Sequence, residues 1–375
     1  MAIVYYFQVL QLHLAKMTAS SCKNCLLTFF IFLCALFHPL HTLAATISLR
    51  DKPKPSTHDL ITTVHQFPNE TWLENVAVRS NGQLLVTRID QPELYQVDPF
   101  PPHGAILVHN FTEAHALGLL GIAEIEQDVF AVIAGTWNDK TFNYTAGSYS
   151  VWRIDLRSYY SASPKVSKIT DIPSALFLNG MTLLPGTPQT VLIADSAAGV
   201  VYRLNAVTSA YDIVLEDDTM KPAADTFPIL GINGVRYHAG YLYYTNSFKG
   251  LFCRVAVNPS TGQAVGRYEI LATGILGDDF ALAVSGDGTI TAYITGDPSN
   301  VLTRVEIKPD GVEAKVVAGN KNSTIIAGDT AAAFGRTNKD EGILYVVTNG
   351  GIAAPVNGTF IEGGKVLAVQ VTELD

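Results

Sequence analysis

Oxygen-bearing side chains at four places in this sequence form a set that could bind a hard metal ion. They are Glu74, Asn179, Asn233 and the adjacent pair Asp278 and Asp279. Carboxylate and amide oxygens are the ligands that Ca²⁺ and Mg²⁺ prefer, whereas zinc sites use histidine and cysteine. The residue types therefore indicate a site for Ca²⁺ or Mg²⁺, or a polar site without a metal. Ordinary turn residues are the alternative, because Asn and Asp are frequent in turns.

These residues belong to a phrase that recurs six times along the chain. Each copy opens on a polar or small residue, continues as an apolar strand and is followed by further strand-like runs. The copies open at residues 74, 120, 179, 233, 279 and 330, so successive openings are 46 to 59 residues apart. A four-stranded blade with its loops has this length. We therefore predict an all-β fold, a six-bladed β-propeller, in which every opening faces one central channel.

The last copy lacks an outermost strand. A strand-like run at residues 60–67 precedes the first copy and has no blade of its own. We expect this run to complete the last blade and close the ring, which removes an exposed sheet edge. Residues 46–59 form a proline-rich, charged lead-in that should be extended. A single propeller domain is thus predicted over residues 60–375.

The first 45 residues have the pattern of a secretory signal peptide. Residues 25–37 are an uncharged run of 13 that follows Lys16 and Lys23 and precedes the small residues Ala44 and Ala45. A retained membrane anchor is the alternative, although a spanning helix needs about 20 apolar residues. We expect a secreted or secretory-pathway protein that is free of the membrane once residues 1–45 are removed.

Glycosylation sequons and cysteine usage fit this localisation. The five predicted N-glycosylation sites are Asn69, Asn110, Asn143, Asn322 and Asn357. Only Cys253 would remain after signal removal, so the mature chain can form no internal disulfide. Cys253 stands in an alternating strand pattern, which indicates a packing residue rather than a nucleophile.

The charge balance excludes one class of partner. The formal net charge is −9, 16% of the residues are charged, and no cluster of lysine and arginine is present. Nucleic acid binding requires a basic face that neutralises phosphates. We therefore expect small-molecule, apolar substrates and no nucleic acid partner.

Aromatic residues near the same strand ends indicate an apolar cup above the polar set. They are Trp72, Trp137, Phe177, Phe248 and Phe334. A polar floor with aromatic walls suits a largely apolar ligand that is held by few hydrogen bonds. Packing between blades is the alternative for Trp72 and Phe334.

Four residues are the candidate catalytic set. Asp279 lies beside Asp278, and His115 lies five residues before the second opening. Trp137, in a polar loop after a strand, and Phe248 are the aromatic candidates for substrate contact. A surface or capping role is the alternative for His115.

The stretch Leu178-Asn179-Gly180-Met181, followed by Val-Leu-Ile-Ala-Asp-Ser at 191–196, resembles the superfamily of gluconolactonases, strictosidine synthase-like proteins and paraoxonases. In paraoxonase-like members an axial calcium is held by Glu, Asn, Asn and Asp of blades one, three, four and five. The resemblance implies that these ligands are Glu74, Asn179, Asn233 and Asp278. Asp279 stands where the family has Asn.

One departure from that pattern bears on function. Paraoxonase-like lactonases carry a histidine base at the second-blade opening, where this chain has Leu120. A hydrolase needs such a base to activate water. The chain also resembles secreted fungal propellers that act as hetero-Diels-Alderases in tropolone-sesquiterpenoid biosynthesis. This resemblance implies a cyclase that couples a tropolone quinone methide to a humulene-type terpene without a nucleophile. A calcium-dependent lactonase or esterase and a non-catalytic binding propeller are the alternatives.

Overall fold

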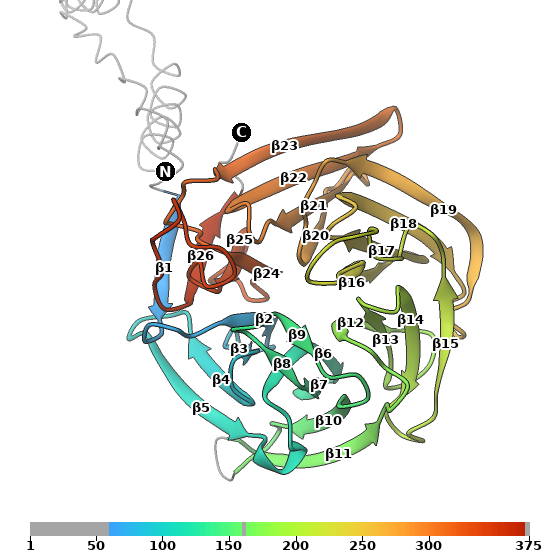
Figure 1. Ribbon diagram of the computed structural model, residues 1–375, viewed down its shortest axis with the longest axis horizontal. Helices are drawn as coiled ribbons and strands as arrows, with labels where there is room; N and C mark the ends of the chain where they lie inside the picture. Colours follow the sequence, from blue (N-terminus) through green and yellow to red (C-terminus); the bar gives the residue numbers. More distant parts are fainter. Residues whose placement is uncertain (1–59, 160–162, 372–375) are drawn as a thin grey trace, which may run out of the picture. The chain divides into compact units, whose positions relative to one another are not determined.

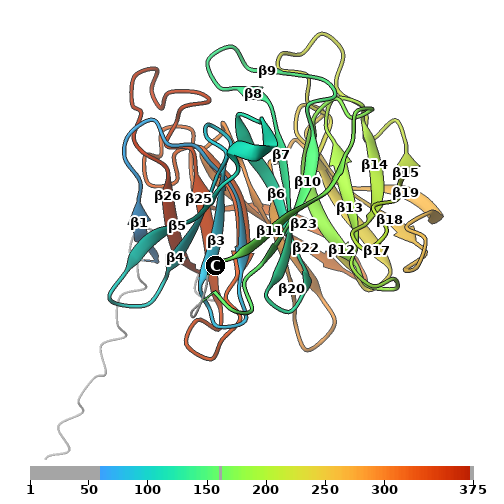
Figure 2. The ribbon, with the colours of Figure 1, turned by 90° about the horizontal axis from the view of Figure 1, so that it is seen from below.

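A computed structural model describes residues 60–159 and 163–371, which form a six-bladed β-propeller (Figure 1). Each blade is an antiparallel sheet of four strands, and Figure 1 shows the blades arranged in a ring, which Figure 2 shows from the side. The six-bladed fold predicted from the sequence is confirmed. Within the described ranges, no helix has the length and apolar character needed to cross a membrane.

The strands of each blade follow one another from the channel outward. Blades one to three contain, in turn, β2 (Leu73–Val78), β3 (Leu84–Arg88), β4 (Glu93–Asp98) and β5 (Gly104–Asn110); β6 (Gly118–Glu126), β7 (Val129–Gly135), β10 (Ser150–Asp155) and β11 (Lys165–Asp171); and β12 (Leu178–Leu184), β13 (Thr190–Asp195), β14 (Val200–Asn205) and β15 (Tyr211–Glu216).

Blades four to six continue the same order. They contain β16 (Ile232–His238), β17 (Tyr241–Asn246), β18 (Leu251–Val257) and β19 (Ala264–Thr273); β20 (Phe280–Val284), β21 (Ile290–Thr295), β22 (Val301–Lys308) and β23 (Gly311–Gly319); and β24 (Asp329–Phe334), β25 (Ile343–Thr348), β26 (Lys365–Gln370) and β1 (Ile61–Gln66). A short 3₁₀ helix (Thr112–Ala114) and a two-stranded hairpin, β8 (Trp137–Asn138) with β9 (Asn143–Tyr144), are added to the blades.

The first strand in the described chain closes the ring. β1 pairs antiparallel with β26, from Ile61 opposite Val369 to Gln66 opposite Lys365. The sheet of blade six therefore combines the two ends of the propeller, as the sequence predicts. The predicted signal peptide, residues 1–45, and the lead-in, residues 46–59, lie outside the described residues.

The second strand of each blade forms the centre of the core. β7 and β13 are buried at every position, because neighbouring blades cover both of their faces. Continuous apolar sequence is the consequence of this double burial, and it is why these strands are the clearest in the sequence.

Glycines let the innermost strands approach each other closely. A β-carbon on Gly121 would lie 2.3 Å from the carbonyl oxygen of Asn179, and one on Gly180 would lie 2.4 Å from that of Asn233. A β-carbon on Gly234 would lie 2.4 Å from Oδ1 of Asp279. The glycines that follow three of the six opening residues are therefore required by packing around the channel, and Asn179 and Asn233 are strand residues rather than turn residues.

Threonine hydroxyls hold the openings of neighbouring blades in place. Oγ1 of Thr87 donates to the carbonyl of Leu120 at 2.8 Å, and Oγ1 of Thr245 donates to that of Asp278 at 2.6 Å. Oγ1 of Thr330 donates to the carbonyl of Leu73 at 2.8 Å across the closure of the ring. These bonds fix the start of each inner strand, where the candidate site lies.

Candidate functional site

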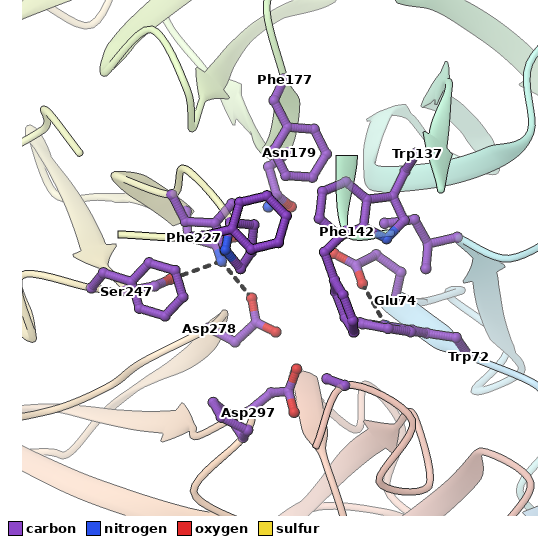
Figure 3. Close-up of a pocket in the computed structure, with 17 residues that line it drawn as sticks. Trp72, Glu74, Trp137, Phe142, Phe177, Asn179, Phe227, Ser247, Asp278 and Asp297 are labelled. Carbon is purple, nitrogen blue, oxygen red and sulfur yellow. Dashed lines mark hydrogen bonds between the residues drawn. The ribbon is translucent and has the colours of Figure 1, made fainter. Parts of the chain in front are cut away.

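A cavity of about 290 Å³ lies at the end of the channel where the inner strands begin (Figure 3). Its polar lining consists of Glu74, Asn179, Asn233, Ser247, Asp278 and Asp297. Its aromatic lining consists of Trp72, Trp137, Phe142, Phe177, Phe227 and Phe248, with Ile89, Leu230, Ala353 and two prolines between them. The cavity thus has the acidic floor and the aromatic walls that the sequence predicts.

The fold brings together all four predicted ligands of the floor. Glu74 lies in β2, Asn179 in β12, Asn233 in β16, and Asp278 two residues before β20. The pairing register of β2, β12 and β16 shifts at these positions. A bulge of this kind re-aims a side chain toward a site. The bulges explain how strand residues turn into the channel.

Burial dominates the electrostatics of Glu74. It raises the pKa of this carboxyl to about 8, with a further increase from the negative charge of Asp297. The indole of Trp72 donates to Oε2 of Glu74 at 3.0 Å and partly offsets this effect. Glu74 therefore stays protonated at neutral pH unless a cation stands beside it.

Asp278 is in the same situation. Burial, followed by the charge of Glu74, raises its pKa well above the usual value. Nδ2 of Asn233 donates to Oδ1 of Asp278 at 2.6 Å and also to Ser247 at 3.0 Å. Two acids on one floor oppose each other's ionisation, which makes the floor a proton donor or a cation site.

Asp297 is a floor residue that the sequence reasoning missed. It follows β21, and burial raises its pKa to about 7. Its Oδ1 atom is inaccessible and has no hydrogen-bond partner in the described part of the chain. In an antiparallel blade the end of the second strand lies at the same edge as the start of the first. Applying that rule to the residues after each second strand would have found Asp297.

Asp279, a predicted catalytic residue, points away from this cavity. Its carboxylate accepts hydrogen bonds from Nδ2 of Asn75 at 2.9 Å and from Nη2 of Arg236 at 2.8 Å, and from the backbone N–H of Phe280 at 2.7 Å. Arg236 lines a second cavity, of about 380 Å³, at the other end of the inner strands. The prediction of Asp279 as a substrate-facing residue is therefore wrong, because hydrogen bonds from Asn75 and Arg236 hold its carboxylate away from the cavity.

His115 also lies outside the site. It is exposed at the end of the 3₁₀ helix and does not line the cavity. Leu120 is fully buried and packs between blades. No histidine is among the residues that line the cavity in the described chain.

The aromatic predictions are met with one exception. Trp72, Trp137, Phe177 and Phe248 all line the cavity. Phe334 lines the second cavity instead, because it ends β24 at the far side of the channel. Phe142 and Phe227 complete the wall, and Phe227 is 65% exposed at the mouth.

The donor set fits a hard cation by its chemistry, since only oxygens and amides are present. Among the described residues, no three His, Cys, Asp or Glu side chains lie close enough together to hold a metal ion. Any calcium would therefore be held by Glu74 and Asp278 with the amides of Asn179 and Asn233, and the Asn233 amide would have to turn its oxygen inward.

Comparison with known proteins gives two relatives of similar length. No protein-family model matches the chain. A protein of Phoma sp. named "Putative hetero-Diels-Alderase" is 28% identical over 313 residues, which cover 76% of this chain and 86% of the relative. "Putative hetero-Diels-Alderase asR5" of Sarocladium schorii is 27% identical over 329 residues, covering 81% and 80%. The predicted resemblance to hetero-Diels-Alderases is confirmed.

Solved structures share the fold at low sequence identity. A luciferin-regenerating enzyme superimposes with a TM-score of 0.55 at 13% identity, covering 82% of this chain and 94% of that one. The calcium-binding protein regucalcin of Agrobacterium tumefaciens gives a TM-score of 0.53 at 14% identity with the same coverage. These likenesses concern the propeller architecture.

Proposed function

We propose that the protein is a cyclase of the hetero-Diels-Alder type, which couples a tropolone quinone methide to a humulene-type terpene. The observation that carries this proposal is the cavity: aromatic walls, an acidic floor and no histidine or cysteine among its lining residues. The names of the two relatives support it, and the matched regions cover 86% and 80% of those proteins. Small, largely apolar molecules are the substrates that such a cavity suits.

The proposed cycloaddition needs no nucleophile from the protein. A cycloaddition forms both new bonds from the two reactants themselves, so the protein has to hold them in register and exclude water. Hydrogen-bond donors aimed at the heteroatom of the diene withdraw electron density and stabilise the transition state. Protonated Glu74, Asp278 and Asp297 are donors of this kind, because burial keeps their pKa values high.

Calcium at the floor is a further part of the proposal. Glu74, Asn179, Asn233 and Asp278 would hold the ion, which would supply positive charge that ionises both acids and polarises a ligand oxygen. Without the ion the same acids remain donors. The two states differ in their response to a chelator, so the assay below is run with and without EDTA.

The test is a coupling assay with purified secreted protein. The hydroxymethyl tropolone loses water to give the quinone methide, which then adds to humulene. Incubation of both compounds with the protein should give a coupled product faster than buffer and with one stereochemistry. Heat-denatured protein is the control. Equal rates and a racemic product would refute the cyclase.

A calcium-dependent lactonase or esterase is the second candidate. The carboxyl of Asp297, with a pKa of about 7, could serve as the base that the missing histidine would otherwise supply. Rapid turnover of a lactone panel that is abolished by EDTA and by Glu74→Gln would favour this function. No response in either assay would favour a non-catalytic binding propeller.

We also propose that the protein enters the secretory pathway, because its five sequons follow the predicted signal peptide. Asn69, Asn143, Asn322 and Asn357 are exposed, which suits glycan attachment. Asn110 is half-buried, and its Nδ2 donates to Glu93 at 3.2 Å.

A further inference from the structure

The three tryptophans of the chain differ in how their indole N–H groups are used. Trp72 donates to Glu74 at 3.0 Å, and Trp152 donates to Oγ of Ser150 at 2.8 Å. The Nε1 atom of Trp137 is inaccessible and has no acceptor in the part of the chain that the structure describes. Leaving a buried donor unpaired costs about 1–3 kcal/mol. An orphaned donor in a native site calls for a physical explanation.

Trp137 stands in the wall of the main cavity. Its side chain is 5% exposed and lines the cavity together with Phe142 and Phe177 (Figure 3). The rings of Trp137 and Phe177 are stacked, with centroids 4.9 Å apart and planes 8° from parallel. The ring of Tyr144 is also stacked on that of Phe177, with centroids 5.7 Å apart. The indole is thus packed against aromatic neighbours in the wall.

The hairpin that carries this donor is small. Trp137 begins β8 and Phe142 precedes β9, and each of these strands has only two residues. The ring of Phe142 lies edge-on to that of Trp137, with centroids 6.1 Å apart, and its centroid is 6.4 Å from that of Trp72. Its φ is +52°, a backbone conformation that costs a non-glycine residue energy and is often found at ligand clamps. A short, strained hairpin can shift to let a ligand reach the indole N–H.

We propose that the indole N–H of Trp137 donates a hydrogen bond to an acceptor oxygen of the ligand. The ligand class is a conjugated carbonyl compound whose flat body lies against the aromatic wall. Resting on the proposed cycloaddition, this assignment places the oxygen-bearing reactant beside Trp137 and makes Trp137 the residue that selects for its oxygen. The apolar reactant then occupies the rest of the cavity, toward Phe227 and Phe248.

The test uses two probes that share a skeleton and differ in one oxygen. 1-Tetralone is a flat aryl ketone with an acceptor and no donor, and tetralin is the same skeleton without the oxygen. Calorimetric titration measures both dissociation constants for the wild type, for Trp137→Phe and for Trp152→Phe. Phenylalanine keeps an aromatic ring in the wall and removes the N–H. Trp152 lies outside the cavity and is the matched control.

We expect Trp137→Phe to weaken 1-tetralone binding roughly tenfold, the value of one hydrogen bond, and to leave tetralin binding unchanged. Trp152→Phe should alter neither. An equal loss for both probes would mean that Trp137 provides apolar contact only, and no loss for either would equally overturn the proposal.

A second measurement does not depend on a variant that folds. In ¹⁵N-labelled wild-type protein the indole N–H resonance of Trp137 should move downfield with 1-tetralone and not with tetralin. A resonance that responds to neither probe would contradict the proposal. Because no turnover is involved, failure of the coupling assay alone would refute the cyclase and leave this hydrogen bond standing.

Discussion

Asp278 and Asp279 are neighbours in the chain, yet their carboxyl groups face opposite ends of the channel. Asp279 is saturated, with donors from Asn75, Arg236 and the backbone of Phe280. Asp278 faces the cavity, where the nearest charges are other acids and burial raises its pKa. The arginine at the far end neutralises its acid, and no basic residue lines the near end.

The difference separates structural from functional polar groups. A buried charge that is fully paired contributes to the fold and has no capacity left for a ligand. A buried acid whose hydrogen-bonding capacity is unfilled costs stability and is free to bind a proton, a cation or a substrate. Glu74, Asp278 and Asp297 belong to the second kind, and Asp279 belongs to the first.

The largest expected effect is a loss of stability when Asp279, whose hydrogen-bonding capacity is filled, is replaced. Asp279→Ala should lower the free energy of unfolding by roughly 3 kcal/mol, because it leaves the guanidinium of Arg236 without its carboxylate. Urea denaturation measures this value. Asp278→Asn is the matched variant and should change stability by less than about 1 kcal/mol, since the amide removes an acid that burial disfavours. Equal losses of stability in the two variants would show that Asp278 and Asp279 do not differ in their structural role.

The next largest effect is a loss of catalysis when an acid of the cavity floor is replaced. Asp297→Asn should reduce the coupling rate roughly a hundredfold, with little change in melting temperature, because the amide can donate a hydrogen bond but cannot give a proton to the hydroxyl that leaves the hydroxymethyl tropolone as water. Asp310→Asn, in an exposed turn, is the surface control and should behave as wild type. Full activity of Asp297→Asn would exclude this acid from the reaction.

The carboxyl groups of the cavity floor should also make the stability of the protein depend on pH. The folded-state pKa values of Glu74 and Asp297 are raised to about 8 and about 7, so the folded protein binds more protons than the unfolded chain above pH 4.5. The contribution of these two carboxyl groups to stability is then greatest below that pH and is lost as the pH rises through 7 and 8. Melting curves in EDTA should therefore shift downward between pH 5 and pH 8.

Two comparisons sharpen this result. Glu74→Gln should flatten the pH dependence, because the amide cannot ionise. Added calcium should raise the melting temperature at pH 8 more than at pH 5, where protons compete with the ion. A pH profile that is identical in wild type and Glu74→Gln would show that the floor does not carry the effect.

The smallest effect is a difference among glycosylation sites. Asn110 is engaged through its amide nitrogen and half-buried, whereas the other four predicted sites are exposed. Enzymatic release of glycans in heavy-oxygen water, followed by mass spectrometry, should mark Asn69, Asn143, Asn322 and Asn357 and leave Asn110 unmarked. Full occupancy at Asn110 would show that its hydrogen bond to Glu93 does not limit attachment.

Much of the fold could be read from the sequence because its elements repeat. The second strands are buried on both faces, so their apolar runs are continuous, and the openings recur at blade spacing. The closure by β1 followed from a missing strand at one end and a spare one at the other. Glu74, Asn179 and Asn233 were found because they occupy equivalent positions in different blades.

The errors arose where direction matters rather than position. Asp279 is next to the correct residue in the sequence, but its carboxylate binds Arg236 instead of facing the cavity. Phe334 is in an inner strand as expected, but it ends that strand at the second cavity. Asp297 lies in no opening phrase, and only the antiparallel blade brings it to the floor. His115 is close to the second opening in sequence and exposed in space.

By itself, then, the sequence determined the architecture and four polar residues of the floor, Glu74, Asn179, Asn233 and Asp278, because strand period and repeat spacing are local properties. Which of two adjacent acids faces the cavity was decided only by the tertiary structure, since Asn75 and Arg236 hold the carboxylate of Asp279 away from it and Asn233 holds that of Asp278 at the floor. The raised pKa values and the orphaned N–H of Trp137 are likewise tertiary properties. They depend on which groups the fold removes from water and which partners it leaves out.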